Sequence, residues 1–302
     1  MIRNAITQDR KTIYDLHSSK VSVDRYDDME FYFSRLYDVD RVIVNDLNGH
    51  VVSSLQVNYH GMILNDTRIV ASTLFGAITQ DDDPEYFKPL LEDVLDEVSR
   101  KTLVSLVITK TPKYYLPYGF ETVYKRKTYE ISRDDLKNRS FEGVGKVFDL
   151  PELEAVYRRF TSHFNGYYER DRDYWVKAFK QYQFLRNNIV VYRSEEGVVE
   201  GYMVYSMTQQ KVYVDEIGYL NGTALIRLLC YALKYKNRAE VTVSESENLN
   251  IAIPKIKGTV KPVMMARIND YALFNRLYQS DVRKVPDGFK LGGKPLYINE
   301  KC

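Results

Sequence analysis

The stretch TRIVASTLFGAITQDDDPEYFKPLLEDVLDEVSRKTLVSLVIT, residues 67–109, predicts a strand, a helix and a second strand in direct succession. Residues 67–79 are rich in β-branched side chains that alternate with others, as is typical of strands. Residues 84–100 then repeat apolar side chains along one helical face, and residues 103–109 form a short apolar run of the buried-strand type. This order favours an α+β layout with helices packed on a sheet.

Four carboxylates, Asp81, Asp82, Asp83 and Glu85, crowd the first strand-to-helix junction. Acids suit the positive end of the helix dipole, and Pro84 is typical of a first helical position. The same oxygens could bind Mg²⁺ or Ca²⁺, but they lack the alternate spacing and the turn glycine of a calcium loop. We therefore expect a helix cap and no metal.

The remaining elements extend this α+β prediction on both sides of the stretch. Residues 9–37 have helical spacing with a break near residues 22–28, and Asn48-Gly49 predicts a hairpin turn between two strands. A second half repeats the order with helices, three antiparallel strands, a helix and a strand, at residues 150–164, 171–184, 187–220, 222–236 and 239–246. The fold class expected is α+β, with two tandem copies of one fold on mixed, mostly antiparallel sheets.

The composition limits the function classes. The 302 residues are 44% hydrophobic, enough for two domains of about 150 residues each. A polar stretch at residues 132–147 separates them. With 43 basic and 41 acidic side chains the net charge is +2, which argues against a general nucleic-acid binder. No apolar run has the length of a signal peptide or a membrane helix, so we expect a cytoplasmic protein. Cys230, in an apolar helical stretch, is expected to pack in a core.

Two parts of the sequence resemble a known family. The strand, helix and strand followed by Tyr-x-x-Tyr-Gly-Phe at residues 115–120 resemble the GNAT superfamily of acyl-CoA-dependent N-acetyltransferases. In the second half, DRDYWVKAF (171–179), VDEIGYL (214–220) and PVMMARINDYALFNRLY (262–278) look like the central domain of the Eis-like (enhanced intracellular survival) acetyltransferases. The resemblance implies GNAT-like domains at residues 1–135 and 145–279, followed by a short extension at residues 280–302. It also implies that most of the third, sterol-carrier-like domain of that family is missing.

The resemblance implies acetyl-CoA as cofactor and an amine as acceptor. Tyr115 falls where the family's general-acid tyrosine protonates the departing CoA thiolate, although its neighbours Tyr114 and Tyr118 make core packing an alternative. The strand before the acidic junction would offer its backbone to the pantetheine arm, through Leu74, Phe75, Gly76, Ala77, Ile78 and Thr79.

The cofactor loop departs from the family pattern. In the family, an Arg/Gln-x-x-Gly-x-Gly/Ala loop holds the pyrophosphate on backbone N–H groups at the helix N-terminus. Counting back from the helix leucines assigns Asp82 to the Arg position and Asp83 and Glu85 to the glycine positions. Each like-charge contact near 4 Å costs about 1 to 4 kcal/mol, so pyrophosphate binding is expected to suffer unless a nearby cation neutralises the acids. The candidates for that cation are Lys88, Lys110, Lys113 and Arg100.

The acceptor side is less well defined by the sequence. An aromatic-walled pocket or ordinary core packing would both suit the helical region that contains Tyr26, Phe31, Tyr32 and Phe33. Candidate bases are Glu30, Asp27, Asp28 and His60. In the second half, Asp215 and Glu216 are expected to play a structural role by pairing with Arg267 or Arg227.

Two functions of different classes therefore remain open. The first is an Eis-like N-acetyltransferase with a degenerate acidic loop that acts on a small-molecule amine or a peptide. The second is a catalytically inactive GNAT-fold binding or scaffold protein that does not bind acetyl-CoA. A third, transfer from aminoacyl-tRNA, would need a basic groove, and the balanced charge supports it only weakly. The resemblance leaves an oligomer open.

Overall fold

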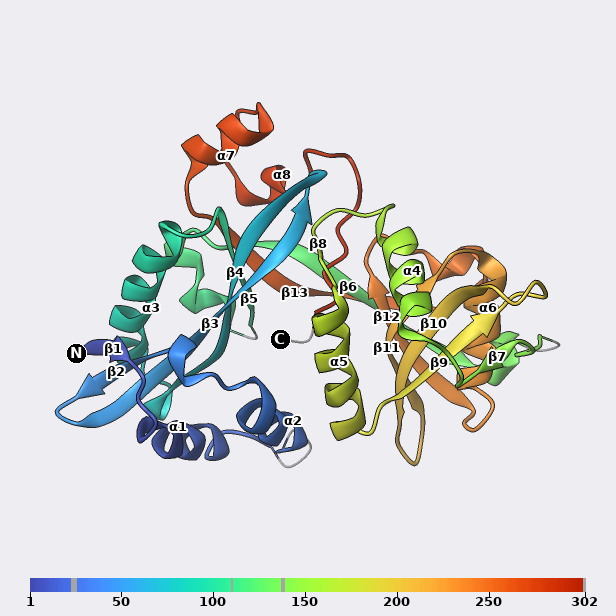
Figure 1. The fold of residues 1–302 in the computed structure, drawn as a ribbon, viewed down its shortest axis with the longest axis horizontal. Coiled ribbons are helices and arrows are strands. Elements are labelled where there is room, and N and C mark those ends of the chain that lie inside the picture. Colours follow the sequence, from blue (N-terminus) through green and yellow to red (C-terminus); the bar gives the residue numbers. More distant parts are fainter. Residues whose placement is uncertain (23–25, 110, 137–138, 301–302) are drawn as a thin grey trace. The chain divides into compact units, whose positions relative to one another are not determined.

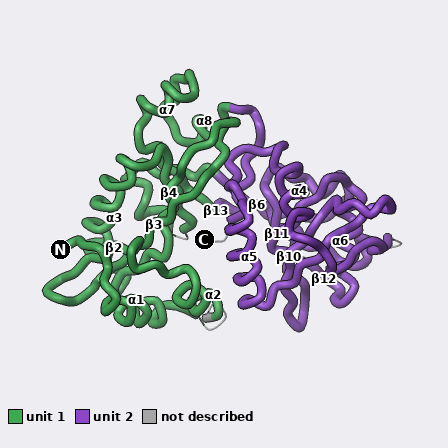
Figure 2. The backbone as a smooth tube through the Cα atoms, in the orientation of Figure 1, with its two compact units in different colours: residues 1–123, 263–291, 301–302 green, residues 124–262, 292–300 purple. Residues whose placement is uncertain are grey.

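A computed structural model describes residues 1–22, 26–109, 111–136 and 139–300 (Figure 1). The chain divides into two compact units, which Figure 2 colours separately. Unit 1 consists of residues 1–123 and 263–291, and unit 2 consists of residues 124–262 and 292–300. Because compactness alone does not define a domain, the expected domain limits 1–135, 145–279 and 280–302 stay a prediction.

Unit 1 contains a mixed sheet in the strand order β1-β2-β3-β4-β5-β13. The strands are β1 (Ile2–Asn4), β2 (Val42–Leu47), β3 (His50–Leu64), β4 (Thr67–Thr79), β5 (Val104–Ile108) and β13 (Gly258–Ile268), of which residues 263–268 belong to this unit. β4 and β5 run parallel, and β1/β2, β2/β3, β3/β4 and β5/β13 are antiparallel. The hairpin between β2 and β3 turns at Asn48 and Gly49, both with positive φ, as the Asn-Gly dipeptide predicts.

Helices cover both faces of this sheet. They are α1 (Asp9–Ser18), α2 (Tyr26–Phe31), α3 (Pro84–Ser99), α7 (Tyr271–Tyr278) and α8 (Val285–Gly288). On β2, Ile43 belongs to the core cluster of α3, whereas Val42 and Val44 belong to the cluster of α1 and α2. Since successive strand residues point to opposite faces, α3 lies on one side and the α1–α2 pair on the other.

Unit 2 contains a sheet in the order β6-β12-β11-β10-β9-β7. Its strands are β6 (Glu121–Ser132), β7 (Val144–Gly145), β9 (Asn188–Arg193), β10 (Val199–Met207), β11 (Val212–Tyr219) and β12 (Arg238–Ser244), and β8 (Tyr167–Tyr168) is a further short strand. β11 and β12 run parallel, and β6/β12, β9/β10, β10/β11 and β7/β9 are antiparallel.

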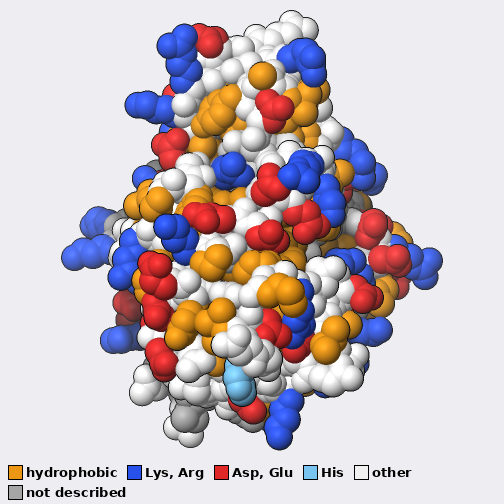
Figure 3. All heavy atoms as spheres, turned by 90° about the vertical axis from the view of Figure 1, so that its left-hand side faces the viewer, with side chains coloured by type: hydrophobic (Ala, Val, Ile, Leu, Met, Phe, Trp, Pro, Cys, Tyr) orange, Lys and Arg blue, Asp and Glu red, His pale blue; other side chains and the backbone are white. Residues whose placement is uncertain are grey.

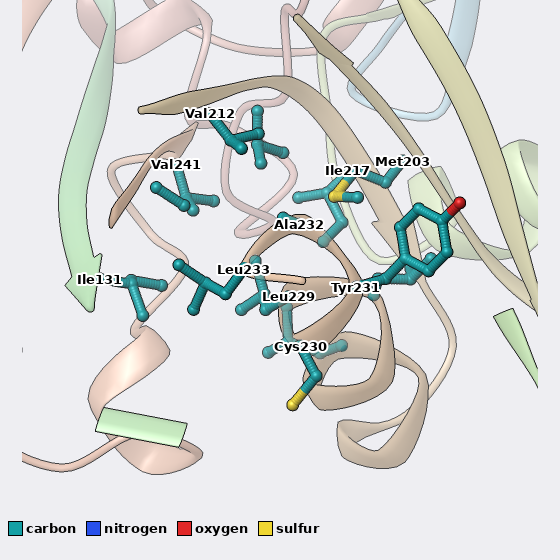
Figure 4. Packing of buried hydrophobic residues seen from close by; sticks show 14 of the residues in the cluster. Ile131, Met203, Val212, Ile217, Leu229, Cys230, Tyr231, Ala232, Leu233 and Val241 are labelled. Carbon is teal, nitrogen blue, oxygen red and sulfur yellow. The ribbon is translucent and has the colours of Figure 1, made fainter. Parts of the chain in front are cut away.

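Helices again cover both faces of the sheet in unit 2. They are α4 (Leu150–Thr161), α5 (Arg172–Phe184) and α6 (Gly222–Ala232). On β9, Val190 packs in the cluster of α6 and Val191 packs in the cluster of α4 and α5. Figure 4 shows the α6 side, where Leu229 and Cys230 lie with Ile217 and Met203. Cys230 is buried there, as the sequence predicts.

The mixed, mostly antiparallel α+β fold with packed helices confirms the fold class. The described part of residues 280–302 contains α8 and a single parallel bridge between Leu296 and Asn165. β13 pairs through Met264–Ile268 with Val104–Ile108 of β5, a long-range pairing that a local apolar pattern does not specify.

Candidate functional site

The candidate site lies where β4 and β5 separate. The two strands pair from Ala71 with Val104 to Leu74 with Val107, and beyond Leu74 β4 continues towards α3 paired with β3 but not with β5. Parallel strands joined by one helix bring their carboxyl ends to the same edge of the sheet. The two segments that follow these ends therefore meet, and the Tyr114 hydroxyl lies 3.5 Å from the carbonyl oxygen of Asp82.

β4 contains a bulge at this edge. Its pairing with β3 shifts register, so that Gly76 and Ala77 of β4 both lie opposite Leu55 of β3. Gly76 has a φ of +59°, which favours glycine, and a Cβ there would lie 2.7 Å from the Tyr32 hydroxyl oxygen. A bulge tilts the strand locally and re-aims its backbone groups, which is why bulges are frequent next to active sites.

The acidic junction is a helix cap, as predicted. The side chain of Asp83 accepts a hydrogen bond from the N–H of Glu85 at 2.9 Å, and Pro84 has no N–H to offer. The N–H of Tyr86 donates to the carbonyl oxygen of Asp83 at 3.3 Å. The N–H groups of Glu85 and Tyr86 are thus already bonded within the protein.

A lysine that the sequence analysis did not name neutralises part of the junction. The Nζ of Lys20, just after α1, lies 2.5 Å from Oδ1 of Asp82 and 2.6 Å from the carbonyl oxygen of Thr79. Of the four cations named from the sequence, Arg100 is a wrong prediction because it pairs with Asp96. Lys113 lies over the Tyr114 ring at 5.2 Å, Lys88 is exposed, and Lys110 is outside the described residues.

The spacing of the cofactor loop needs a correction. If Asp83 and Glu85 stand at the two glycine positions of Arg/Gln-x-x-Gly-x-Gly/Ala, the Arg/Gln position three residues earlier is Gln80 and not Asp82. Gln80 begins the 3₁₀ turn that leads into α3, and its side chain is exposed. At this spacing the resemblance assigns Gln80 to the Arg/Gln position and the acids Asp83 and Glu85 to the glycine positions.

Tyr115 lies in the core beside this junction. It follows β5 in a 3₁₀ turn, is 4% exposed and packs in one cluster with Leu74 and Phe87. Its ring meets those of Phe87 and Phe120 edge-on, with centroids 6.0 and 5.6 Å apart. Burial raises the pKa of the Tyr115 phenol, so the hydroxyl keeps its proton at neutral pH. Among the described residues no hydrogen bond to this hydroxyl is seen.

The aromatic residues expected near the acceptor are packed as a core. Phe31, Tyr32 and Phe33 are buried, and the side chain of Tyr26 is outside the described part of the chain. The Tyr32 ring packs edge-on against Phe75 of β4 at 5.1 Å, and its hydroxyl donates to Oε1 of Gln56 at 3.3 Å. The Tyr32 ring thus covers the bulged part of β4.

The candidate bases are scattered. Oε1 of Glu30 accepts a hydrogen bond from the Tyr14 hydroxyl, and Asp27 and Asp28 are exposed on α2. Nε2 of His60 lies 2.6 Å from Oγ1 of Thr73 on β4. Burial lowers the pKa of His60 to about 4, so this imidazole is neutral at pH 7.

His17 is a site residue that sequence reasoning missed. It lies on α1 with its ring centroid 5.6 Å from that of Tyr32 and 5.3 Å from that of Phe33. Its Nε2 is buried and has no partner among the described residues, and burial lowers its pKa to about 4. Its position one helical turn after the buried Ile13 is the signal that could have placed it inside.

The structural role expected for Asp215 and Glu216 involves different partners. Glu216 forms a buried ion pair with Arg170, through Nη1 and Oε1 at 2.5 Å, and not with Arg267 or Arg227. Asp215 accepts a hydrogen bond from Nδ2 of Asn187 at 3.2 Å. Arg170 lies 46 positions from Glu216, and no local pattern distinguishes it from the other arginines of the chain.

No metal-binding arrangement comes together in the described ranges, where no group of three or more His, Cys, Asp or Glu side chains is placed to hold an ion. The same ranges contain no helix that is long and apolar enough to cross a membrane. On the face shown in Figure 3, basic and acidic side chains are interspersed over the surface.

The comparisons support the GNAT superfamily. Residues 166–268 match a family described as an acetyltransferase (GNAT) domain. Solved structures that resemble the chain include a GCN5-related N-acetyltransferase of Anabaena variabilis, with a TM-score of 0.74, 15% identity, and coverage of 89% of this chain and 73% of that one. The Eis protein of Mycobacterium abscessus gives a TM-score of 0.68 at 14% identity, covering 91% of this chain and 75% of that one.

A more distant likeness concerns an acyl-CoA complex. The N-myristoyltransferase of Saccharomyces cerevisiae, solved with bound myristoyl-CoA, gives a TM-score of 0.58 at 9% identity, covering 89% of this chain and 78% of that one. No curated protein sequence matches the chain. At these identities the structural likeness shows the fold alone, so the fold is that of the GNAT acyltransferases.

Proposed function

We propose that the chain is an Eis-like GNAT N-acyltransferase that moves an acyl group from a CoA thioester, with acetyl-CoA as the expected donor, to an amine. The acceptor would be a small-molecule amine or a peptide. One observation carries the proposal: β4 and β5 separate beside the bulge at Gly76 and Ala77, with Tyr115 packed at the same edge. This arrangement leaves one backbone edge of β4 without β5 as a partner.

The residues at this edge fit the acyl-bearing half of the cofactor. The edge of β4 beyond Leu74, through Thr79, offers backbone groups to a pantetheine arm. The bound thioester would supply an activated acyl carbon, to which the amine nitrogen would bond as the carbon–sulfur bond breaks. Tyr115 holds a phenolic proton at neutral pH and would pass it to the departing thiolate. The proton that the amine loses would pass to solvent, from which Tyr115 would be reprotonated.

The residues at the junction fit a diphosphate poorly. The first-turn N–H groups of Glu85 and Tyr86 are bonded internally, and Asp81, Asp82 and Asp83 bring negative charge to the spot. Lys20 offsets one of these charges. We therefore expect acetyl-CoA to bind more weakly than a glycine loop would allow, with the arm contributing most of the affinity.

The same junction favours a second candidate function. A GNAT-fold binding or scaffold protein that does not bind acetyl-CoA would need no free N–H groups at the start of α3, and the Asp83 cap takes up that of Glu85. Equilibrium binding of acetyl-CoA separates the two candidates, because the enzyme requires it and the scaffold does not.

Unit 2 supports the further proposal of two tandem GNAT-like domains. Its β11, α6 and β12 repeat the order of β4, α3 and β5, and β11 and β12 pair in parallel only through Val212–Val214 and Ala239–Val241. The cytoplasmic location and any oligomer stay predictions.

Turnover tests the proposal directly. The full chain would be incubated with acetyl-CoA and a panel of polyamines, aminoglycosides and peptides, and CoA release would be followed with a thiol reagent. We expect release with at least one amine and a kcat about 10²–10⁴-fold lower for Tyr115→Phe. Tyr118→Phe is the control, because its hydroxyl lies on the exposed side of the same turn and donates to Glu92. Release that is unaffected by Tyr115→Phe would remove Tyr115 from the mechanism.

A further inference from the structure

Residues 294–300 lie in unit 2 like a bound peptide. Two glycines precede them, and Gly293 has a φ of +68° and open space where a Cβ would be. Leu296, Tyr297, Ile298 and Asn299 are each at most 9% exposed. Four consecutive residues of a short segment without a helix or strand of its own are therefore buried, whereas Pro295 before them is exposed.

The backbone of this segment is held as peptide ligands commonly are. The N–H of Asn165 donates to the carbonyl oxygen of Pro295 at 2.8 Å, and the N–H of Tyr297 donates to the carbonyl oxygen of Asn165 at 2.9 Å. Oγ of Ser244, the last residue of β12, donates to the carbonyl oxygen of Leu296 at 2.8 Å. Main-chain bonds of this kind give affinity with little dependence on sequence.

Two side chains give the contact its specificity. The Tyr297 ring packs against Phe160 and Phe164, with centroids 5.3 and 5.2 Å apart. Glu300 places Oε1 3.1 Å from Nε and 3.0 Å from Nη2 of Arg170, and its Oε2 accepts a hydrogen bond from the Tyr174 hydroxyl. A guanidinium that donates twice to one carboxylate is a strong and directional recognition element.

Arg170 bonds the segment, including the carbonyl oxygen of Asn299 at 3.2 Å, and it is also held by groups outside the segment. Its other edge bonds both carboxylate oxygens of Glu216 on β11, at 2.5 and 3.1 Å, and its guanidinium lies 4.2 Å from the centroid of the Tyr157 ring. The Arg170 side chain has no exposed surface. If residues 294–300 left, Nε of Arg170 and the Tyr174 hydroxyl would still point at an open position that suits one carboxylate.

We propose that the surface contacted by residues 294–300 is a binding site for an extended peptide that carries a carboxylate, and that the chain fills this site with its own segment. The site consists of Asn165, Arg170, Tyr174 and Ser244, and its ligand is recognised by an aromatic ring and a carboxylate three residues apart. The segment detaches locally while the rest of unit 2 stays folded. This inference does not depend on the proposed acyl transfer.

Amide hydrogen exchange on the full chain tests the proposal. We expect Glu300→Gln to speed exchange of the amides of residues 296–299 at least about tenfold, while β10 and β11 keep the wild-type rate. Glu195→Gln, an exposed carboxylate in the same unit, is the control and should change neither. Equal acceleration of β10, or no acceleration at residues 296–299, would overturn the proposal.

A synthetic peptide tests recognition in the same experiment. The amidated peptide GGKPLYINE, with the sequence of residues 292–300, should slow exchange at Asn165 in Glu300→Gln, and the peptide with glutamine in place of the glutamate should not. Equal protection by both peptides, or by neither, would contradict carboxylate recognition. If Glu300→Gln does not fold, Tyr174→Phe removes one hydrogen bond to Glu300 and should give a smaller acceleration, about threefold, at the same residues.

Discussion

Glu247 is a carboxyl buried in unit 2, where few polar groups reach it. It accepts hydrogen bonds from the N–H of Ser244 at 2.9 Å and from the Tyr219 hydroxyl at 3.0 Å. Burial disfavours the charged form more than these bonds favour it, so the pKa of Glu247 is raised to about 7. In the unfolded chain the same carboxyl titrates near 4.5.

This shift predicts a loss of stability as the pH rises. Between pH 4.5 and 7 the folded protein binds more protons at Glu247 than the unfolded chain does, so the free energy of unfolding falls across this window. The contribution to that fall is on the order of 3 kcal/mol. Glu247→Gln should reduce the fall, as followed by urea unfolding at several pH values. Glu245→Gln, at an exposed neighbour, should leave the pH dependence of the free energy of unfolding unchanged. The same dependence in Glu247→Gln as in the wild type would show that burial does not raise the pKa of Glu247.

Tyr115 contributes to stability through its ring and not through its hydroxyl. The ring is packed against Phe87 and Phe120, while no hydrogen bond of the hydroxyl is seen in the described ranges. Tyr115→Phe should therefore change the free energy of unfolding by less than about 1 kcal/mol, and Tyr115→Ala should lower it by about 3 to 5 kcal/mol. Urea unfolding of both variants checks this. A large loss in Tyr115→Phe would reveal a buried hydrogen bond that the account lacks.

Single residues were predictable where their role is local. The capping by Asp83 and the burial of Cys230 follow from the neighbouring sequence. Lys20 lies 62 positions from its partner Asp82, and Arg170 lies 130 positions from Glu300, so no local pattern signals either pair. Ion pairs over such distances depend on the tertiary fold.

At the scale of elements, α3 depends on its cap. The Asp83 side chain accepts a hydrogen bond from the N–H of Glu85, and the ring of Pro84 fixes φ at the first residue of the helix. Asp83→Ala should lower the free energy of unfolding by about 1 kcal/mol because a first-turn N–H loses its acceptor. Asp81→Ala is the matched control at an exposed neighbour outside the cap, although its positive φ adds a small strain. Thermal unfolding compares the two, and an equal or smaller loss for Asp83→Ala would mean that its cap does not stabilise α3.

Elements that follow from a local sequence pattern were predictable, and those that depend on residues far away in the sequence were not. The Asn48-Gly49 hairpin and the amphipathic α3 lie where the sequence places them. β13 lies beside β5 although their paired residues are 156 to 164 positions apart in the sequence. This pairing was not predictable because the apolar run of β13 would suit several neighbouring strands equally well. The bulge at Gly76 was also unforeseen, because a glycine in a strand pattern fits a bulge or a close approach alike.

At the scale of the whole molecule, the fold and the proposed chemistry are linked through the separation of parallel strands. Each unit has one parallel pair joined by a helix, β4 with β5 and β11 with β12. In unit 1 the opening beyond Leu74 carries the bulge and the acidic junction. In unit 2, Ser244 at the end of β12 contacts residues 294–300 of the chain itself. The sequence predicts the order of these elements. The groups that lie beside the separated strands, such as Lys20 in unit 1 and residues 294–300 in unit 2, come from distant parts of the chain.

Calorimetric titration with acetyl-CoA tests the central claim, which is that a GNAT-fold acyl-CoA site remains beside a junction whose acids weaken it. The wild type would be compared with the double variant Asp83→Gly, Glu85→Gly, which keeps Gln80, and with Asp81→Gly as the control. Removing two like-charge contacts should tighten binding at least about tenfold in the double variant and by much less in the control. Detectable but weak binding by the wild type, tightened in this way, is the predicted result. No binding by either protein, or no gain in the double variant, would contradict the account.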